Sequence, residues 1–214
     1  MAQVRKWSNV AVAMQSALGA AKTLTAITQG ATATVTSTAH GFVNGDYVLL
    51  TAQGMRQVDG RVFRVASSTA NNFVLEGEDT SSYDAFSSGS AQLITFGTSI
   101  TTATSVSSSG GDFDFIDTTT IHGNAKTQIP GLANPATYTF DNIWDVSDAG
   151  LKAMKLASDA QAPRCFKFVF GQGGQIMLFN GYVGASLLPG GQAQDKVTTS
   201  TAITMFGSPT YYAS

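Results

Sequence analysis

Residues with reactive side chains are few in this chain of 214 amino acids, and they lie far apart. The chain has one cysteine, Cys165, and two histidines, His40 and His122. A structural zinc site takes four Cys or His ligands, and a catalytic triad needs a nucleophile, a base and an orienting acid. Each histidine precedes a glycine, which is typical of turns, and Cys165 lies in the apolar run RCFKFVF, which favours a buried thiol. We expect structural roles for all three.

Three acids, Asp112, Asp114 and Asp117, are spaced closely enough to suggest a calcium loop. An EF-hand loop also needs a glycine at position six and a glutamate at position twelve, and this stretch has neither. Asp112 and Asp114 instead alternate with Phe113 and Phe115, a pattern that predicts a strand with the acids on one face. An exposed strand is therefore the better interpretation.

The glycine-rich segment GQGGQ at 171–175 lacks the Gly-Lys-Ser/Thr ending of a phosphate-binding loop, and we predict a hairpin turn there. We find no paired carboxylates or activated nucleophile. The sequence therefore predicts no catalytic residues, no metal, no cofactor and no enzyme.

Period-two alternation of apolar residues dominates the chain and predicts a mainly β fold. It is clear at residues 10–14 and in FKFVF at 166–170, whose hairpin partner is predicted in QIMLFNGYVG, with a last long strand in KVTTSTAITMF. One helix is predicted at about 147–159, with Ser147 as its N-cap and Leu151, Met154 and Ala157 on one face.

Short strand candidates separated by turns fill residues 23–93 and predict a small all-β module inserted into a larger β domain of residues 1–22 and 94–214. A Ser/Thr-rich segment follows at 95–111, which is compatible with a strand, a flexible loop or both in turn.

Composition points to an assembly subunit. Charged residues make up 12% of the chain and the net charge is −2, so the surface favours association and offers no basic cluster for tight nucleic-acid binding. The N-terminal apolar stretch is interrupted by Ser8, Asn9 and Gln15, which makes a poor signal peptide, and no run is long enough to span a membrane. We expect synthesis in a cytoplasm.

The C-terminal two-thirds resembles the tail tube (major tail) proteins of siphophages. The resemblance rests on FDFIDTTTIHGNAKTQIPGLANPATYTFDNIWD, the helix SDAGLKAMKLAS, RCFKFVF, GYVGASLLPGG and DKVTTSTAITMFGSPTYY. The stretch from TAITQGATATVTS to EDTSSYDAF is similar to a small β module that recurs in phage tail proteins.

This resemblance implies a tail-tube β-sandwich or barrel with one packed helix and an inserted β module. It implies a virion protein whose six copies form a ring, with rings stacked head to tail around DNA that passes without specific binding. The implied partners are other copies of the chain and the tape-measure, tail-tip initiator and tail terminator proteins, with no membrane partner.

Within such a tube, Asp112, Asp114 and Asp117 are candidates for a lumen-facing surface over which DNA would slide. Stacking needs a segment that orders on assembly, and our candidates are residues 97–111 and 120–131. They contain the predicted assembly-loop residues Ser107, Ser108, Gly110, Gly111, Ile129, Pro130 and Gly131.

Two other hypotheses remain at this point. One is the tube protein of a contractile tail or type VI-like injection system. The other is a virion decoration or adhesin protein with a glycan-binding insert, although the aromatic residues of the insert alternate like core residues: Phe42, Tyr47, Phe63, Phe73 and Tyr83.

Overall fold

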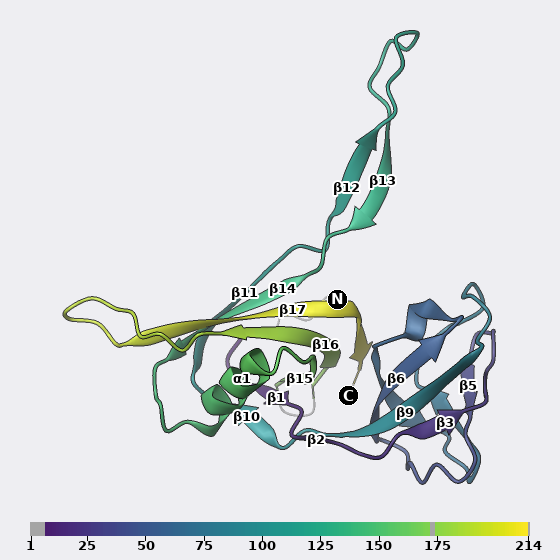
Figure 1. Cartoon of the computed structure of the whole chain (residues 1–214), viewed down its shortest axis with the longest axis horizontal. Helices are drawn as coiled ribbons and strands as arrows, with labels where there is room; N and C mark the ends of the chain where they lie inside the picture. The colour runs from purple at the N-terminus through teal and green to yellow at the C-terminus, as the bar shows by residue number, and fades with distance from the viewer. Residues whose placement is uncertain (1–6, 172–173, 214) are drawn as a thin grey trace.

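Two curled antiparallel sheets, a projecting two-stranded arm and one α-helix make up the structure (Figure 1). It is a computed structural model that describes residues 7–171 and 174–213. The predicted mainly β fold with a single packed α-helix is confirmed over these residues.

The first sheet, called the body here, has seven strands. In spatial order they are β10 (Thr98–Ile100), β1 (Val10–Met14), β15 (Arg164–Phe170), β16 (Ile176–Ala185), β17 (Thr198–Tyr212), β14 (Thr137–Ile143) and β11 (Ala103–Ser109). The predicted hairpin of FKFVF with QIMLFNGYVG is confirmed, because Phe168 pairs with Met177 and Phe166 with Phe179. The turn predicted between them includes residues 172 and 173, which lie outside the described residues.

The second sheet, called the module here, is formed by the strands between β1 and β10. In spatial order they are β2 (Ala17–Leu18), β9 (Ser88–Thr95), β6 (Tyr47–Gln53), β7 (Val62–Ala66), β8 (Asn72–Leu75), β5 (Ala33–Thr36) and β4 (Ala26–Ile27), with β3 (Lys22–Leu24) also on β9 and a short 3-10 helix at Arg56–Val58. This sheet begins before residue 23 and ends after residue 93. The division into two domains remains a prediction.

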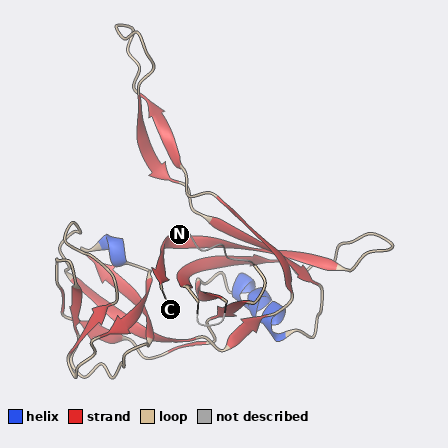
Figure 2. Ribbon diagram, turned by 180° about the vertical axis from the view of Figure 1, so that it is seen from behind, coloured by secondary structure: helices blue, strands red, loops and turns tan. Residues whose placement is uncertain are grey.

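The arm consists of β12 (Phe113–Asp117) and β13 (Gln128–Ala133), which pair only with each other among the described strands. Seen from behind, it leaves the body at the end of β11 and β14 (Figure 2).

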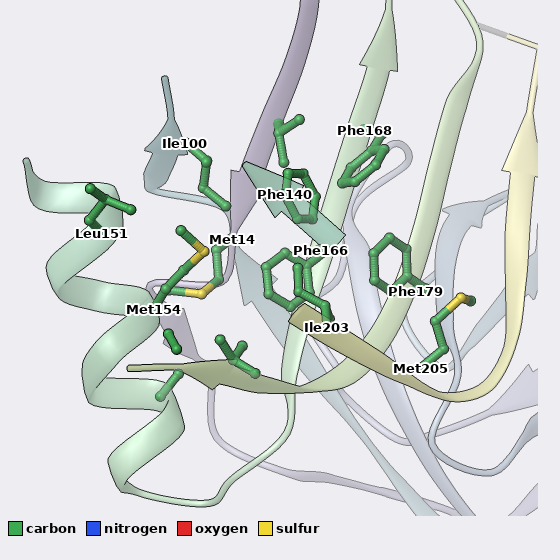
Figure 3. Close-up of a cluster of buried hydrophobic side chains, with 14 of the residues drawn as sticks. Met14, Ile100, Phe140, Leu151, Met154, Phe166, Phe168, Phe179, Ile203 and Met205 are labelled. Atoms are coloured by element: carbon green, nitrogen blue, oxygen red, sulfur yellow. The ribbon is translucent and has the colours of Figure 1, made fainter. Parts of the chain in front are cut away.

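The core of the body lies between the sheet and the helix α1 (Ala149–Asp159). Phe140, Phe166, Phe168 and Phe179 are fully buried and form edge-to-face and stacked pairs. On the helix, Leu151 and Met154 point toward Met14 and Ile100 from the sheet (Figure 3). Each large side chain buried in this way contributes about 1.5–3 kcal/mol.

Close approach of α1 to the sheet requires a glycine in the first turn of the helix. A Cβ atom at Gly150 would lie 2.6 Å from the carbonyl oxygen of Ser99, the middle residue of β10. Absence of a side chain there lets the helix cover the short edge strand.

The predicted N-cap of this helix is wrong by one residue. Asp148, with extended backbone angles, accepts a hydrogen bond from the Leu151 N–H at 2.7 Å, which is the N-cap interaction. Ser147 instead donates its hydroxyl to Asp145 Oδ1 at 2.6 Å. Both residue types cap helices well, so the local sequence does not separate them, and packing of Leu151 into the core decides the start of the helix.

The module has an apolar core of its own and is also bonded to the body. The end of β17 provides three contacts: Tyr212 Oη accepts from the Arg64 N–H at 2.8 Å, Thr210 donates to the Val62 carbonyl at 2.6 Å, and Arg61 donates to the Ser208 carbonyl at 3.2 Å. A separate apolar cluster spans the contact and includes Val62, Ile94, Cys165, Leu178 and Tyr212. The two sheets therefore share a buried interface.

Replacing Asp148 with Ala should lower the free energy of unfolding by about 1 kcal/mol, because the N-terminal amides of α1 lose their acceptor. Urea denaturation followed by tryptophan fluorescence measures the change. Ser147→Ala is the matched control and should have a smaller effect. A larger loss for Ser147→Ala than for Asp148→Ala would contradict this assignment.

Replacing Tyr212 with Phe should cost about 1 kcal/mol, because the partly buried Arg64 N–H is left without its acceptor. The neighbouring Tyr211 is largely exposed, and Tyr211→Phe should change stability by less than about 0.5 kcal/mol. Equal effects in thermal or urea unfolding would show that the contact does not hold the module to the body.

Candidate assembly surfaces

The arm is a hairpin whose register shifts between Phe113 and Phe115, and its strands pair with no other strand of the described residues. Ile116 lies opposite Ile129, and Asp117 lies opposite Gln128. Beyond this pair, the Thr118 N–H donates to the Thr127 carbonyl, and the chain turns through residues 119–126 at the tip. Every side chain of β12 is exposed.

Apolar side chains are concentrated on this arm. The exposed fraction is 64% for Phe115, 87% for Leu132 and 96% for Ile121 at the tip. Phe113, Ile116 and Ile129 are also more than half exposed. A two-stranded hairpin is marginally stable alone, and clustered exposed apolar residues are typical of interaction sites. The arm is thus suited to contact another protein.

The three predicted lumen-facing acids all lie on the arm, in or next to β12. Asp114 Oδ1 accepts from the Asn134 amide at 3.1 Å. Hydrogen bonds from the side chain and backbone N–H of Thr119 lower the pKa of Asp117. Asp112 is exposed at the base of the arm. Their orientation in an assembly remains a prediction.

The predicted assembly-loop residues are divided between strands and one junction. Ser107 and Ser108 lie in β11, so the Ser/Thr-rich segment forms strands, and Ile129, Pro130 and Gly131 lie in β13 rather than in a loop. The remaining two, Gly110 and Gly111, connect β11 to the arm.

This junction depends on glycine. The φ angles of Gly110 and Gly111 are 82° and 86°, and a Cβ at Gly110 would lie 2.4 Å from the Pro135 carbonyl oxygen. Residues other than glycine rarely adopt such φ values, because their Cβ atom clashes with the backbone. The two glycines therefore set the direction in which the arm leaves the body.

The body sheet has free backbone edges. β11 pairs with β14 on one side and with no described strand on the other. At the far end of the curl, β10 is a three-residue edge strand. The pairing of β15 with β16 ends at Gly181. Beyond it, residues 182–185 of β16 pair with β17 on one side and with no described strand on the other. Free edges are templates for pairing with another chain.

A cleft of about 430 Å³ lies where the two ends of the curled sheet approach each other. Its lining includes Trp7, Val10 and Val12 on the β1 side and Ile100 and Val106 on the β10–β11 side. Val12 and Ile100 belong to the core of the body, so the cleft is a gap in the sheet above that core.

A second projection, the loop of residues 186–197, extends beyond β16 and β17 (Figure 1). A bridge between Gly190 and Thr198 closes the loop, and Leu188, between β16 and this bridge, is 73% exposed. The sequence analysis did not single out this loop.

The side chains with reactive potential are separated in space. Cys165 is buried, and desolvation raises the pKa of its thiol to about 12. His40 is buried in the module, where its Nδ1 accepts from the Phe42 N–H at 3.0 Å, and His122 is exposed at the tip of the arm. In residues 7–171 and 174–213, no group of three His, Cys, Asp or Glu side chains is placed to hold a metal ion.

A mainly β protein with free sheet edges and an apolar arm is typical of structural proteins that associate into larger assemblies. A comparison with known protein families agrees with this structural role. The chain belongs to the phage tail tube protein family, whose model matches residues 53–214, from the end of β6 through the body. No curated protein matches the chain. Family membership supports a structural role in the tail of a virion and self-assembly into a tube.

None of the helices in the described residues has the length and apolar character needed to cross a membrane.

Cys165 should be unreactive in the folded protein. With a pKa of about 12, the thiolate fraction at pH 8 is about 10⁻⁴. Iodoacetamide should therefore label the single thiol only after denaturation, as read by mass spectrometry. An added exposed thiol, Ser81→Cys on the module, is the control and should react at once. Rapid labelling of native Cys165 would reopen the question of a reactive cysteine.

Proposed function

We propose that six copies of the chain form a ring, and that rings stack head to tail into the tube through which DNA is ejected into the host. Membership of the tail tube protein family is the observation that carries this proposal. The tape-measure, tail-tip initiator and tail terminator proteins are the proposed partners, and assembly takes place in the cytoplasm of the bacterial host.

Free backbone edges support ring closure. Within one chain, the strands β11, β14, β17 and β16 lie side by side in this order. β11 and the end of β16 are therefore the two outer edges of this four-stranded part of the sheet. Neighbouring copies that pair β11 with the end of β16 would satisfy free backbone groups on these two edges. Ala185 is an exception, because its N–H already donates to the Ser158 hydroxyl at 3.1 Å.

The dimensions of such a ring suit a DNA duplex. Four strands from each of six copies give about 24 strands, which at ~4.8 Å spacing and ~40° tilt enclose a barrel about 48 Å in diameter. Side chains on the walls leave roughly 35–40 Å, wide enough for a duplex whose width is about 20 Å.

Contacts between rings are assigned to the arm and to the junction at Gly110 and Gly111. The exposed apolar side chains of the arm would be covered by a neighbouring copy, which gives the hairpin the packing that it lacks alone. Ordering of the arm on assembly would limit premature polymerisation. The arm acids Asp112, Asp114 and Asp117 remain candidates for a lumen-facing surface.

The module is proposed to lie on the outer wall. Its shared apolar cluster with the body argues against a freely dispensable insert, because its removal would uncover Leu178 and Tyr212. Phe42, Phe63 and Phe73 are buried in its core and provide no exposed aromatic platform for glycans, which disfavours the adhesin alternative.

The tube proposal predicts that Leu132→Asp abolishes assembly and leaves the fold intact, because this side chain is exposed in the single chain and would be buried between copies. Light scattering and negative-stain electron microscopy of concentrated samples measure assembly, and circular dichroism verifies the fold. Wild-type chain should form hollow rings or tubes with a central channel.

Val43→Asp is the matched control, because Val43 is an exposed apolar residue of the module, and this variant should assemble as wild type. Normal tubes from Leu132→Asp would exclude the arm from the contact. Wild-type chain that forms no hollow assembly at any concentration, with or without its tail-tip initiator, would contradict the proposed function itself.

A further inference from the structure

The two ends of the β16–β17 hairpin differ in what covers them. At one end, called the closed end here, α1 packs on the core and its Ser158 hydroxyl accepts from the Ala185 N–H at 3.1 Å. Ala185 pairs there with Thr201 of β17. At the other end, called the open end, Ile176 pairs with Tyr212, and two adjoining clefts occur beside this pair.

The clefts at the open end have volumes of about 480 and 580 Å³ and share Tyr138 and Tyr211 as lining residues. Phe170 and Ile176 also line the first cleft, and Phe113, at the base of the arm, lines the second. We call the two clefts together the end groove. None of the described residues that line it is charged, and Tyr211 is 68% exposed. Exposed apolar and aromatic side chains gathered in this way are typical of a protein contact site.

At the closed end, the loop of residues 186–197 projects beyond the sheet (Figure 1). Its first part, SLLPGGQAQ at 186–194, contains no charged residue. Leu187 has a φ angle of 54°, in the left-handed region that residues with a side chain rarely adopt, and it packs against the core of the body. Leu188, the next residue, is 73% exposed. The backbone of the loop thus places one leucine in the core and the other outside it.

Hydrogen bonds at the base of the loop hold it in this conformation. Trp144 donates its indole N–H to the Leu187 carbonyl at 2.9 Å and its backbone N–H to the Val197 carbonyl at 3.0 Å. Gly190 and Thr198 exchange two backbone hydrogen bonds of 2.8 Å. A loop that is ordered before binding loses less conformational entropy in a contact. The loop is therefore suited to dock as a preformed element.

Head-to-tail stacking brings the two ends of the hairpin together. Strands tilted by ~40° to the axis of a barrel place the ends of a hairpin at opposite ends of the ring. Because stacked rings all point the same way, the closed end of one copy faces the open end of a copy in the next ring. The arm leaves from the open end, since Phe113 at its base lines the end groove. The loop is the element that projects from the closed end (Figure 1).

We infer that the loop of residues 186–197 docks into the end groove of a copy in the adjacent ring, with Leu188 against Tyr138 and Tyr211. This inference rests on the proposed tube function and names a contact between rings that is separate from the exposed face of the arm. Both surfaces are uncharged, so docking desolvates no ionic group. The contact joins two different surfaces and leaves both free at the ends of a stack, so it can repeat without limit.

The test is a disulfide between rings. Leu188→Cys and Tyr211→Cys are introduced into one chain, whose native Cys165 is buried, and assembled tubes are oxidised. Within one chain the two positions lie near opposite ends of the β16–β17 hairpin, about 30 Å apart and too far for a disulfide. Non-reducing gels should therefore show covalent ladders of more than six chains from tubes, and monomers from unassembled chain.

Leu188→Cys combined with Val43→Cys, on the module, is the matched control and should give no ladder. A ladder from the first pair that ends at six chains would overturn the inference, because the contact would then lie within a ring and close on itself. Normal tubes of that variant without any ladder would also count against it.

Leu188→Asp is the second variant, and we expect folded chains that form rings but do not stack, as seen by circular dichroism and negative-stain electron microscopy. Leu156→Asp is the matched control, because Leu156 on α1 is a leucine of similar exposure, and it should stack as wild type. Normal tubes from Leu188→Asp, or loss of rings as well as tubes, would contradict the assigned contact. Failure of wild type to form tubes would contradict the proposed function instead.

Discussion

Strand β17 joins the two halves of the body sheet and attaches the module to it. Its residues pair with β14 and β16, and alternation along it sends one set of side chains into the core and the other to the opposite face of the sheet. Near its end the chain bends at Gly207, and Thr210 and Tyr212 hold the module. This one strand thereby contributes side chains to the core of the body and holds the module against it.

Charged side chains are scarce on the surface of this protein, since they make up 12% of the chain and several form internal ion pairs. The charged residues are few, and several are used internally: Arg61 pairs with Glu78, and Arg64 pairs with Glu76, both near the contact between module and body. The arm is left with several exposed apolar side chains. A surface with few charges repels other copies weakly and so favours association. This property suits a subunit of a tube.

The single chain leaves backbone groups unpaired at its sheet edges and apolar side chains exposed on the arm. A lone hairpin and an unpaired edge strand are both costly in water, and the proposed contacts with further copies would remove both costs. The glycine junction sets the direction of the arm, while the body and module form a common rigid support through their shared apolar cluster. In the proposed tube, assembly would therefore complete the packing of the arm and the pairing of the free edges.

Periodicity in the sequence determined the mainly β fold, the β15–β16 hairpin, the long last strand and the packed helix, because alternation and helical spacing are local properties. The resemblance carried by its motifs determined the family. Tertiary structure decided the rest. Asp148 rather than Ser147 caps the helix, because the burial of Leu151 sets where the helix begins. Ile129 to Gly131 form a strand, because β12 lies beside them. Cross-strand register brings Ser107, Thr139 and Ala202 into one row of the sheet, although they are far apart in the chain.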